Sequence, residues 1–285
     1  MLRALPQGWR LFLKTRLDVL LVEQGYFDSR VSAQRAIMAG QVFVDGQISD
    51  KPGTQIRDGA EVTVKGGLCP YVSRGGFKLE KALDVFGIRP KGLVCIDIGS
   101  STGGFTDCLL QRGAARVYAV DVGTNQLAWK LRSDERVVTM EQYNFRYAAP
   151  EDFPDIMDFA CTDVSFISLK LILPPAASLL KEGGLMVALI KPQFEAGKDQ
   201  VGKHGIVKDP KVHEEVIRKV SGYANESGFS VLDLDYSPVR GAKEGNIEYL
   251  VLLRKEGAEA AKSSISASLI EETVNISHSN FDTAE

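Results

Sequence analysis

The chain has 285 residues, of which 44% are hydrophobic and 25% are charged, and its net charge is −3. This composition is typical of folded globular proteins and excludes collagen-like, coiled-coil and wholly disordered chains. The longest apolar stretches, such as residues 185–190, are far shorter than the ~20 residues that cross a bilayer, so no membrane-spanning segment is expected. The slightly acidic average still leaves room for a local basic face.

The four cysteines show neither a C-x-x-C pair nor the spacing of zinc ligands; they are Cys69, Cys95, Cys108 and Cys161. Free thiols favour a reducing, cytoplasmic location. His204 and His213 have no cysteine nearby, so no metal site is expected. Residues 1–14 contain scattered basic and apolar side chains, which predict a short N-terminal extension rather than a targeting signal.

Residues 15–65 predict two helices followed by short strands. Thr15 is the expected N-cap of the first helix, with Asp18 at its third position. Ser29 is the expected cap of a second helix, which ends at Gly40. Strands are expected over 42–44, 47–48 and 61–64, with an Asp-Gly hairpin turn between the first two.

This helix–helix–hairpin order resembles the small S4-type RNA-binding domain, with Ser29-Arg30 opening the second helix and residues 39–46 following it. The resemblance implies that Arg16, Arg30 and Arg35 contact RNA phosphates, to which arginine donates bidentate hydrogen bonds. A solvated helix face is an equally open interpretation, because residues 1–66 carry nine Lys/Arg against seven Asp/Glu.

From residue 92 onward, apolar strands alternate with helices, which predicts an α/β fold with an open, mostly parallel sheet. Expected strands include 93–98, 116–120, 159–162, 185–190, 231–234 and 249–253, and seven strands are plausible in total. Only a Gly/Pro/Lys-rich loop separates the last two, so they should pair antiparallel. We therefore expect a linker at 66–72 and a larger domain at 73–254.

Residues 255–285 change in character, with two lysines against six acidic residues and many Ser and Ala. This composition predicts a weakly structured acidic tail.

A glycine-rich loop follows the predicted strand 93–98 and opens a helix, where α/β sheets bind nucleotides. Its G-x-x-x-G-G spacing is neither the dinucleotide fingerprint nor a P-loop, so phosphate binding is disfavoured. The loop resembles the S-adenosylmethionine loop of class I methyltransferases, with a ligand-free tight turn as the alternative. The resemblance implies cofactor contacts from Asp97, Gly99, Ser101, Gly103, Gly104, Phe105 and Asp121, with Asn144 either beside the adenine or in an Asx-turn.

Four further residues sit on short polar interruptions between elements: Lys78, Asp163, Lys191 and Glu248. Asp163 and Lys191 each follow an apolar run expected to be a parallel strand, hence on the ligand side of the sheet. Their order resembles the tetrad of FtsJ-type ribose 2′-O-methyltransferases. Together with the S4-type domain and residues 73–79 and 203–210, it resembles the TlyA family.

The TlyA resemblance implies a Rossmann-like methyltransferase domain that uses S-adenosyl-L-methionine to methylate the 2′-hydroxyl of cytidine in ribosomal RNA. The implied partners are ribosomal RNA or ribosomal subunits, with Arg74 as a further RNA contact, no membrane, and a monomer favoured. Lys191 is the predicted base. Burial or a nearby Lys78 would lower its pKa and the two acids would raise it, so a positioning and proton-relay role for the tetrad stays open.

Two other functions stay open. Members of this family have been labelled haemolysins, which suggests a membrane-active protein, although no amphipathic helix supports it. The larger domain could also be an inactive scaffold attached to an RNA-binding module.

Overall fold

The computed structural model divides the chain into two compact units, Met1–Pro70 and Tyr71–Glu285. It describes residues 14–24, 26–27, 29–38, 40–57, 59–64, 70–241, 245–257, 260 and 262–282. Most of the expected N-terminal extension, 1–14, and of the expected linker, 66–72, therefore lies outside the described residues. Each unit has its own buried apolar core.

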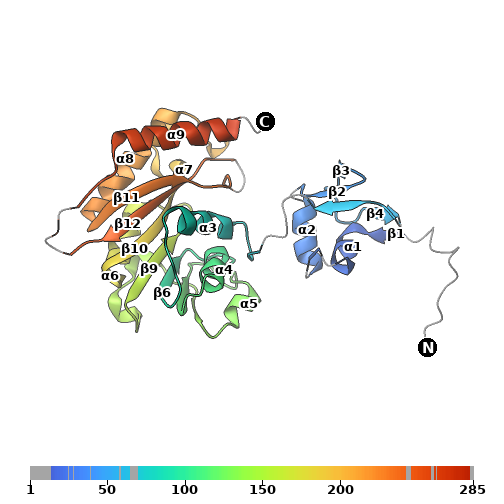
Figure 1. The fold of residues 1–285 in the computed structure, drawn as a ribbon, viewed down its shortest axis with the longest axis horizontal. Helices are drawn as coiled ribbons and strands as arrows, with labels where there is room; N and C mark the ends of the chain where they lie inside the picture. The colour runs from blue at the N-terminus through green and yellow to red at the C-terminus, as the bar shows by residue number, and fades with distance from the viewer. Residues whose placement is uncertain are drawn as a thin grey trace. The chain divides into compact units, whose positions relative to one another are not determined.

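The N-terminal unit packs two helices against short strands (Figure 1). Its elements are β1 (Lys14–Arg16), α1 (Leu17–Glu23), α2 (Arg30–Met38), β2 (Val42–Val44), β3 (Gln47–Ile48), β4 (Gln55–Arg57) and β5 (Val62–Val64). Strands β3, β2 and β5 form one sheet, and β1 pairs with β4. Leu17, Leu21 and Ile37 are fully buried, and removing such side chains from water stabilises the unit. The predicted β2–β3 hairpin is confirmed.

The predicted start of the first helix is wrong. Thr15 lies in β1, opposite Ile56, and α1 begins only at Leu17. Asp18 is fully buried, and its carboxylate accepts hydrogen bonds from Arg16, Arg30 and Gln34. The acid that suggested a capping box therefore holds α1 against α2. Ser29 does cap α2, because its Oγ accepts the amide of Ser32.

The C-terminal unit is built on a seven-stranded sheet, as predicted. Its strands are β6 (Val94–Ile98), β7 (Arg116–Val120), β8 (Val137–Met140), β9 (Met157–Thr162), β10 (Leu180–Ile190), β11 (Phe229–Tyr236) and β12 (Tyr249–Lys255). They lie in the order β11-β12-β10-β9-β6-β7-β8. The five from β8 to β10 are parallel, whereas β12 runs antiparallel to both β10 and β11. The chain order reverses between β6 and β9, the switch point where such sheets bind ligands.

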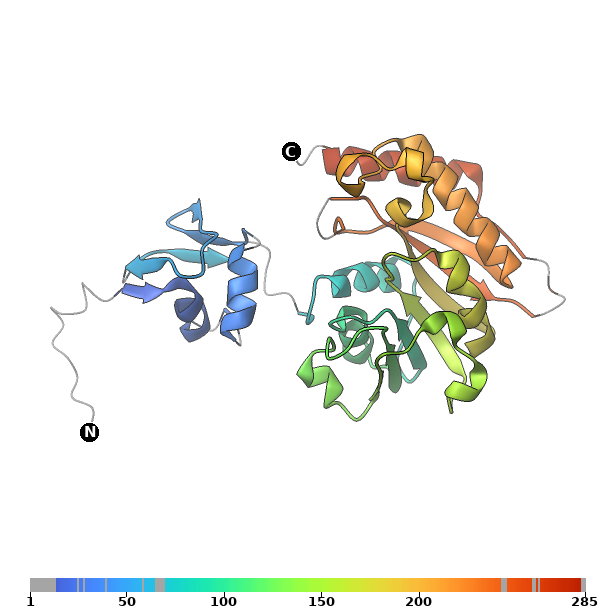
Figure 2. The same cartoon turned by 180° about the vertical axis from the view of Figure 1, so that it is seen from behind.

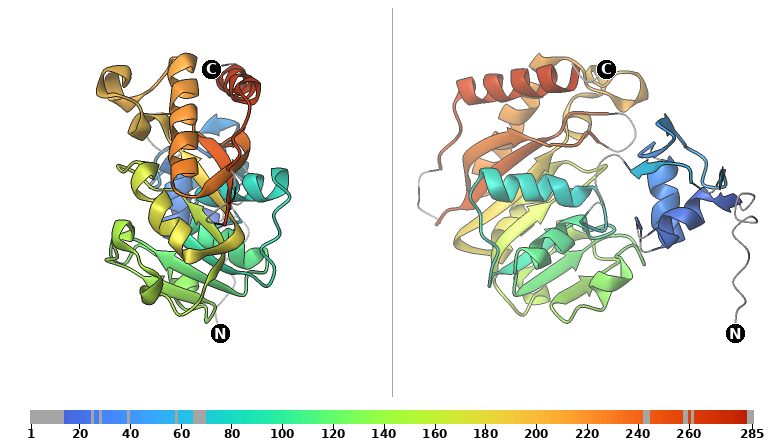
Figure 3. Two further views of the ribbon diagram at one scale, coloured as in Figure 1. Left: turned by 90° about the vertical axis from the view of Figure 1, so that its left-hand side faces the viewer. Right: turned by 45° about the vertical axis from the view of Figure 1, so that its right-hand side comes forward.

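Helices cover both faces of this sheet. One face carries α3 (Gly75–Val85), α4 (Gly104–Gln111) and α5 (Trp129–Arg132), and the other carries α6 (Leu173–Leu179) and α8 (Pro210–Glu226) (Figures 1 and 2). The side view in Figure 3 separates α3 from α6. Side chains alternate along β6, with Cys95 on the α3–α4 face and Ile96 on the α6–α8 face, so Asp97 also points toward α4.

Short helical turns complete the unit. They are η2 (Phe145–Tyr147), η3 (Pro150–Asp152), η4 (Leu169–Leu171), α7 (Pro192–Glu195), η5 (Lys198–Gln200) and η6 (Lys203–Gly205). Within the described residues, no helix is both long and apolar enough to span a membrane.

The expectation of a weakly structured tail at 255–285 is wrong, because residues Ala267–Asp282 form helix α9. Its buried side chains include Ile270, Val274 and Ser277, at the i, i+4, i+7 spacing of one helix face. This face packs on α8 and β11. Glu271 and Glu272 are exposed on the other face, so the acidic composition coexists with an apolar stripe.

Candidate active site

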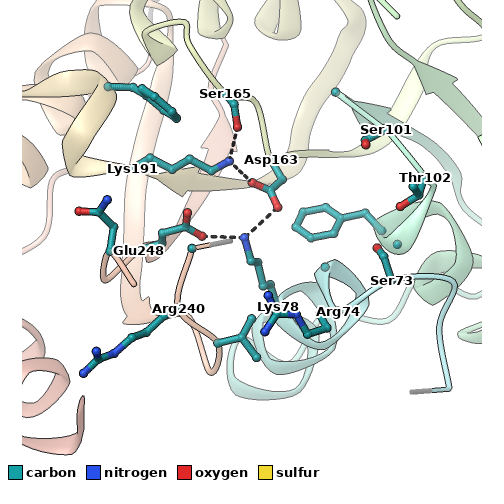
Figure 4. Close-up of a pocket in the computed structure, with 18 of the residues that line it drawn as sticks. Ser73, Arg74, Lys78, Ser101, Thr102, Asp163, Ser165, Lys191, Arg240 and Glu248 are labelled. Atoms are coloured by element: carbon teal, nitrogen blue, oxygen red, sulfur yellow. Dashed lines mark hydrogen bonds and ion pairs between the residues drawn. The ribbon is translucent and has the colours of Figure 1, made fainter. Parts of the chain in front are cut away.

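The four charged residues predicted as a group meet at one edge of the sheet (Figure 4). Lys78 projects from α3, while Asp163 follows β9 and Lys191 follows β10. Glu248 directly precedes β12, and because β12 is antiparallel to β10 its start lies at the same edge. The chain direction of each strand therefore brings together residues that are up to 170 positions apart.

Asp163 connects the two lysines into one continuous network. Its Oδ2 lies 3.0 Å from Lys78 Nζ, and its Oδ1 lies 2.6 Å from Lys191 Nζ. Lys78 Nζ also lies 2.6 Å from Glu248 Oε2. Lys191 Nζ donates a further hydrogen bond of 2.9 Å to Ser165 Oγ. Two lysines thus face two acidic side chains in a largely dry environment, where such pairs are strong.

In this network, burial and neighbouring charges shift the pKa values of Asp163 and Lys78 in opposite directions, and the effect of the charges is the larger. Burial alone would raise the pKa of Asp163, but the two lysines hold it below its usual value. Burial alone would lower the pKa of Lys78, but Asp163 and Glu248 hold it above its usual value. Lys78 and Asp163 are therefore both charged at neutral pH.

Two positions of the glycine loop between β6 and α4 require glycine for structural reasons. Gly103 has a φ of 95°, and a Cβ there would lie 2.3 Å from Leu131 Cδ1. A Cβ at Gly104 would lie 2.9 Å from the backbone nitrogen of Gly76, so α4 can approach α3 only without a side chain.

Asp97, at the other side of the site, has a different environment from Asp163. Its Oδ2 accepts hydrogen bonds from the backbone amide and the Oγ1 of Thr106, at 2.9 and 2.7 Å. No Lys, Arg or His among the described residues forms an ion pair with it. Burial raises the pKa of Asp97 to about 7, and the nearby Asp163 and Asp121 carboxylates add to the rise.

A cavity of about 690 Å³ contains both the tetrad and the glycine loop. In Figure 4, Ser101 and Thr102 lie on one side of Asp163, with Lys191, Glu248 and Arg240 on the other. The predicted cofactor residues that line it are Asp97, Gly99, Ser101, Gly104 and Phe105. No cluster of three or more possible metal ligands occurs in the part of the chain that the structure describes.

Three predicted cofactor residues do not line this cavity: Gly103, Asp121 and Asn144. Asp121 nevertheless contacts the loop, because its Oδ2 accepts the amide of Ser101 at 2.8 Å. Asn144 caps η2 by accepting the amide of Arg146, which is the Asx-turn alternative.

Comparison with known proteins agrees with this geometry. The FtsJ-like methyltransferase family model matches residues 71–255, and the S4 domain model matches residues 15–62. The chain is 41% identical over 263 residues to the 16S/23S rRNA (cytidine-2′-O)-methyltransferase TlyA of Mycobacterium tuberculosis, covering 92% of this chain and 96% of the relative. The chain belongs to the TlyA family of FtsJ-like methyltransferases.

Two further relatives are more similar in sequence. A Bacillus subtilis protein, YqxC, named as an rRNA methyltransferase, is 56% identical over 86% of this chain and 87% of its own length. A solved structure of a hemolysin-named protein from Streptococcus thermophilus has a TM-score of 0.77 at 52% identity, covering 95% of this chain and 98% of that one.

The predicted RNA-binding arginines of this TlyA-family chain divide into separate groups. Arg16 and Arg30 are joined through buried Asp18, and each side chain stays about half exposed, at 45% and 55%. Arg35 is exposed elsewhere on α2. Arg74 lies in the other unit, exposed on the cavity wall just before α3. Two of the arginines therefore also have a structural role, and the contacts of all four with RNA stay a prediction.

Several cavity residues were missed from the sequence. Ser165 bonds to Lys191, and Phe166 is 90% exposed with its ring 5.0 Å from that of Phe194. Ser165 and Phe166 directly follow Asp163 and Val164, so the polar break after β9 pointed to the segment. Nothing in the sequence distinguishes Phe166 from a core aromatic.

Proposed function

We propose that this protein transfers a methyl group from S-adenosyl-L-methionine to the ribose 2′-hydroxyl of cytidine in ribosomal RNA. The observation that carries the proposal is the Lys78–Asp163–Lys191–Glu248 network, which faces the same cavity as the glycine loop. The curated relative's name supplies the base and the RNA class. The network supplies a means of handling the hydroxyl proton.

The glycine-loop side of the cavity fits the cofactor. S-adenosylmethionine supplies an activated methyl group on a positively charged sulfur. Asp97 is a buried carboxylate without a cationic partner among the described residues, so it favours a ligand that brings positive charge. Asp121 fixes the loop through Ser101 and leaves lone pairs for ribose hydroxyls.

The tetrad side of the cavity fits the ribose. Lys78 stays charged and contacts both Asp163 and Glu248, whereas Lys191 contacts a single carboxylate, Asp163, which makes Lys191 the tetrad member that we assign to the proton transfer. Neutral Lys191 accepts the 2′-hydroxyl proton at Nζ, while Asp163 and Ser165 orient that Nζ. The exposed ring of Phe166 offers a surface on which an unstacked base can lie.

The S4 domain supplies RNA affinity in this proposal. Arg16, Arg30 and Arg35 contact phosphates of ribosomal RNA or of a ribosomal subunit, and Arg74 does so at the cavity. The protein acts as a monomer in the cytoplasm, where ribosomal RNA is found and where the buried thiols of Cys95, Cys108 and Cys161 stay reduced.

The decisive experiment follows a labelled methyl group from S-adenosylmethionine into ribosomal subunits that lack the native modification. We expect 2′-O-methylcytidine with the wild type and its loss in Lys191→Ala. If the protein bound the cofactor but transferred no methyl group, the proposed substrate would be wrong. If it did not bind the cofactor, the proposal that it is a methyltransferase would be wrong.

Because one relative is named as a hemolysin, membrane lysis is a second activity to measure. Leakage of a dye from liposomes distinguishes the two, since the proposed methyltransferase should cause none. An inactive scaffold would instead bind ribosomal RNA without binding the cofactor.

A further inference from the structure

A second cavity adjoins the first. It has a volume of about 440 Å³, and His204 lines both cavities. The other lining residues are Gln200, Gly202, Lys203, Ile206, Lys208 and Asp209. A chain that leaves the main cavity past His204 therefore enters this second space.

The second cavity carries cations without partners. The amino groups of Lys203 and Lys208 are exposed and form no ion pair or hydrogen bond with any residue that the structure describes. Other lysines of this unit do have carboxylate partners, among them Lys81, Lys130 and Lys181. Unpaired cations gathered at a cavity favour an anionic ligand.

The single acid in this cavity does not neutralise the lysines. Asp209 is the N-cap of α8, and its Oδ1 accepts the backbone amide of Lys211 at 2.9 Å. One carboxylate, already engaged by a backbone donor, therefore faces two free ammonium groups.

The loop that carries these lysines is fixed to the tetrad's own segment. Asn246 is 3% exposed, and its amide donates to Gly205 O at 2.9 Å and accepts from Val207 N at 3.0 Å. Asn246 lies two positions before Glu248. The cationic loop is thus held at a defined place relative to the reacting groups, and a ligand meets a preformed site.

We propose that the second cavity binds the phosphodiester group next to the methylated nucleotide, with Lys203 and Lys208 contacting its oxygens. The inference rests on the proposed function, because a ribose held in the main cavity must have its neighbouring phosphate outside it. Lysine binds phosphate as a point charge and reads no base, so this subsite positions the strand without adding sequence preference.

The test compares four full-length proteins: wild type, K203Q/K208Q, K203R/K208R and K91Q. Lys91 is a matched control, exposed in the turn before β6 and thus at the opposite edge of the sheet. Binding of one labelled ribosomal RNA fragment is measured at several salt concentrations. Removing two phosphate contacts should make the slope of log affinity against log salt shallower by about 1.4. The arginine variant and K91Q should keep the wild-type slope, and all four should bind S-adenosylmethionine equally.

Several results would overturn the subsite: equal slopes for wild type and K203Q/K208Q, an equal loss in K91Q, or a parallel loss of cofactor affinity. Failure of the proposed function gives a different result, namely no methyl transfer to RNA by the wild type. The salt slopes still decide whether Lys203 and Lys208 contact phosphate, because they need no turnover.

Discussion

Two aspartates, Asp97 and Asp163, face one cavity from the neighbouring strands β6 and β9, yet their environments are opposite. Asp163 has two lysines within 3.0 Å, and its pKa is lowered. Among the described residues, Asp97 accepts hydrogen bonds only from the uncharged Thr106, and its pKa is raised to about 7.

Under the proposed function, this contrast separates the places of the two substrates. The Asp163 side already has lysine partners from the protein and suits an uncharged hydroxyl. The Asp97 side has no cationic partner among the described residues and suits a positively charged ligand. The proposed reaction therefore uses charge to assign each ligand to one side of the cavity.

Arginine substitutions test the two lysines around Asp163 and should give the largest effect. Lys191→Arg should reduce kcat between about 100-fold and 10,000-fold, because arginine stays protonated and cannot act as a base. Lys78→Arg keeps the permanent charge that Lys78 supplies, so it should retain at least about tenfold more activity than Lys191→Arg. Single-turnover methyl transfer measures both. Near-normal turnover in Lys191→Arg would show that Lys191 acts only as a cation.

Asp163 should also contribute more to stability than an aspartate in a surface ion pair. Asp163→Asn leaves two buried lysines with only Glu248 and should lower the free energy of unfolding by about 3 kcal/mol. The exposed pair Arg112–Asp84 provides a control, since Asp84→Asn should cost less than about 1 kcal/mol. Denaturant unfolding monitors both variants. Equal costs would mean that the tetrad contributes no more than a surface ion pair.

Asp97 should give cofactor binding a pH dependence. Below pH 7 its carboxyl is protonated, and above pH 7 it is ionised and attracts a cation, so affinity should rise with pH. We expect S-adenosylmethionine to bind about tenfold more weakly at pH 6 than on the plateau above pH 7.5. Calorimetry on wild type and Asp97→Asn measures this. The variant should bind weakly at every pH, and a pH-dependent variant would assign the titration to another group.

The sequence predicted the four members of the tetrad but not the difference between these aspartates. Chain order placed Asp163 and Lys191 after neighbouring strands, and the sheet confirms that placement. Whether a carboxylate has a cation within 3.0 Å depends on side-chain packing between α3 and three strands, for which the sequence holds no local signal. Phe166 was missed for the same reason, because its exposure results from the turn after β9.

The errors in the fold also have physical causes. Asp18 has the spacing of a capping box, but its burial beside Arg16 and Arg30 outweighs the local cap. The net charge of the tail predicts weak structure, whereas the spacing of Ile270 and Val274 indicates a helix with one apolar face. Composition averaged over 31 residues conceals a stripe formed by a few of them.

Helix α9 offers the mildest test, because its link to the cavity is indirect, through Arg240 on the tetrad side. The guanidinium of Arg240, which lines the cavity, donates to the carbonyl of Phe281 and lies 5.0 Å from its ring. Phe281→Ala removes the ring contact and should raise KM for RNA by about fivefold, equivalent to about 1 kcal/mol. Cofactor affinity should stay unchanged, because the glycine loop lies across the cavity.

The matched control for Phe281→Ala is Ile276→Ala on the exposed face of the same helix, which is 43% exposed and should change neither constant. Steady-state kinetics with varied RNA, together with cofactor binding at equilibrium, separates the two sides. If Phe281→Ala weakened cofactor and RNA equally, α9 would act through the stability of the whole unit, and the two sides of the cavity would not be independent.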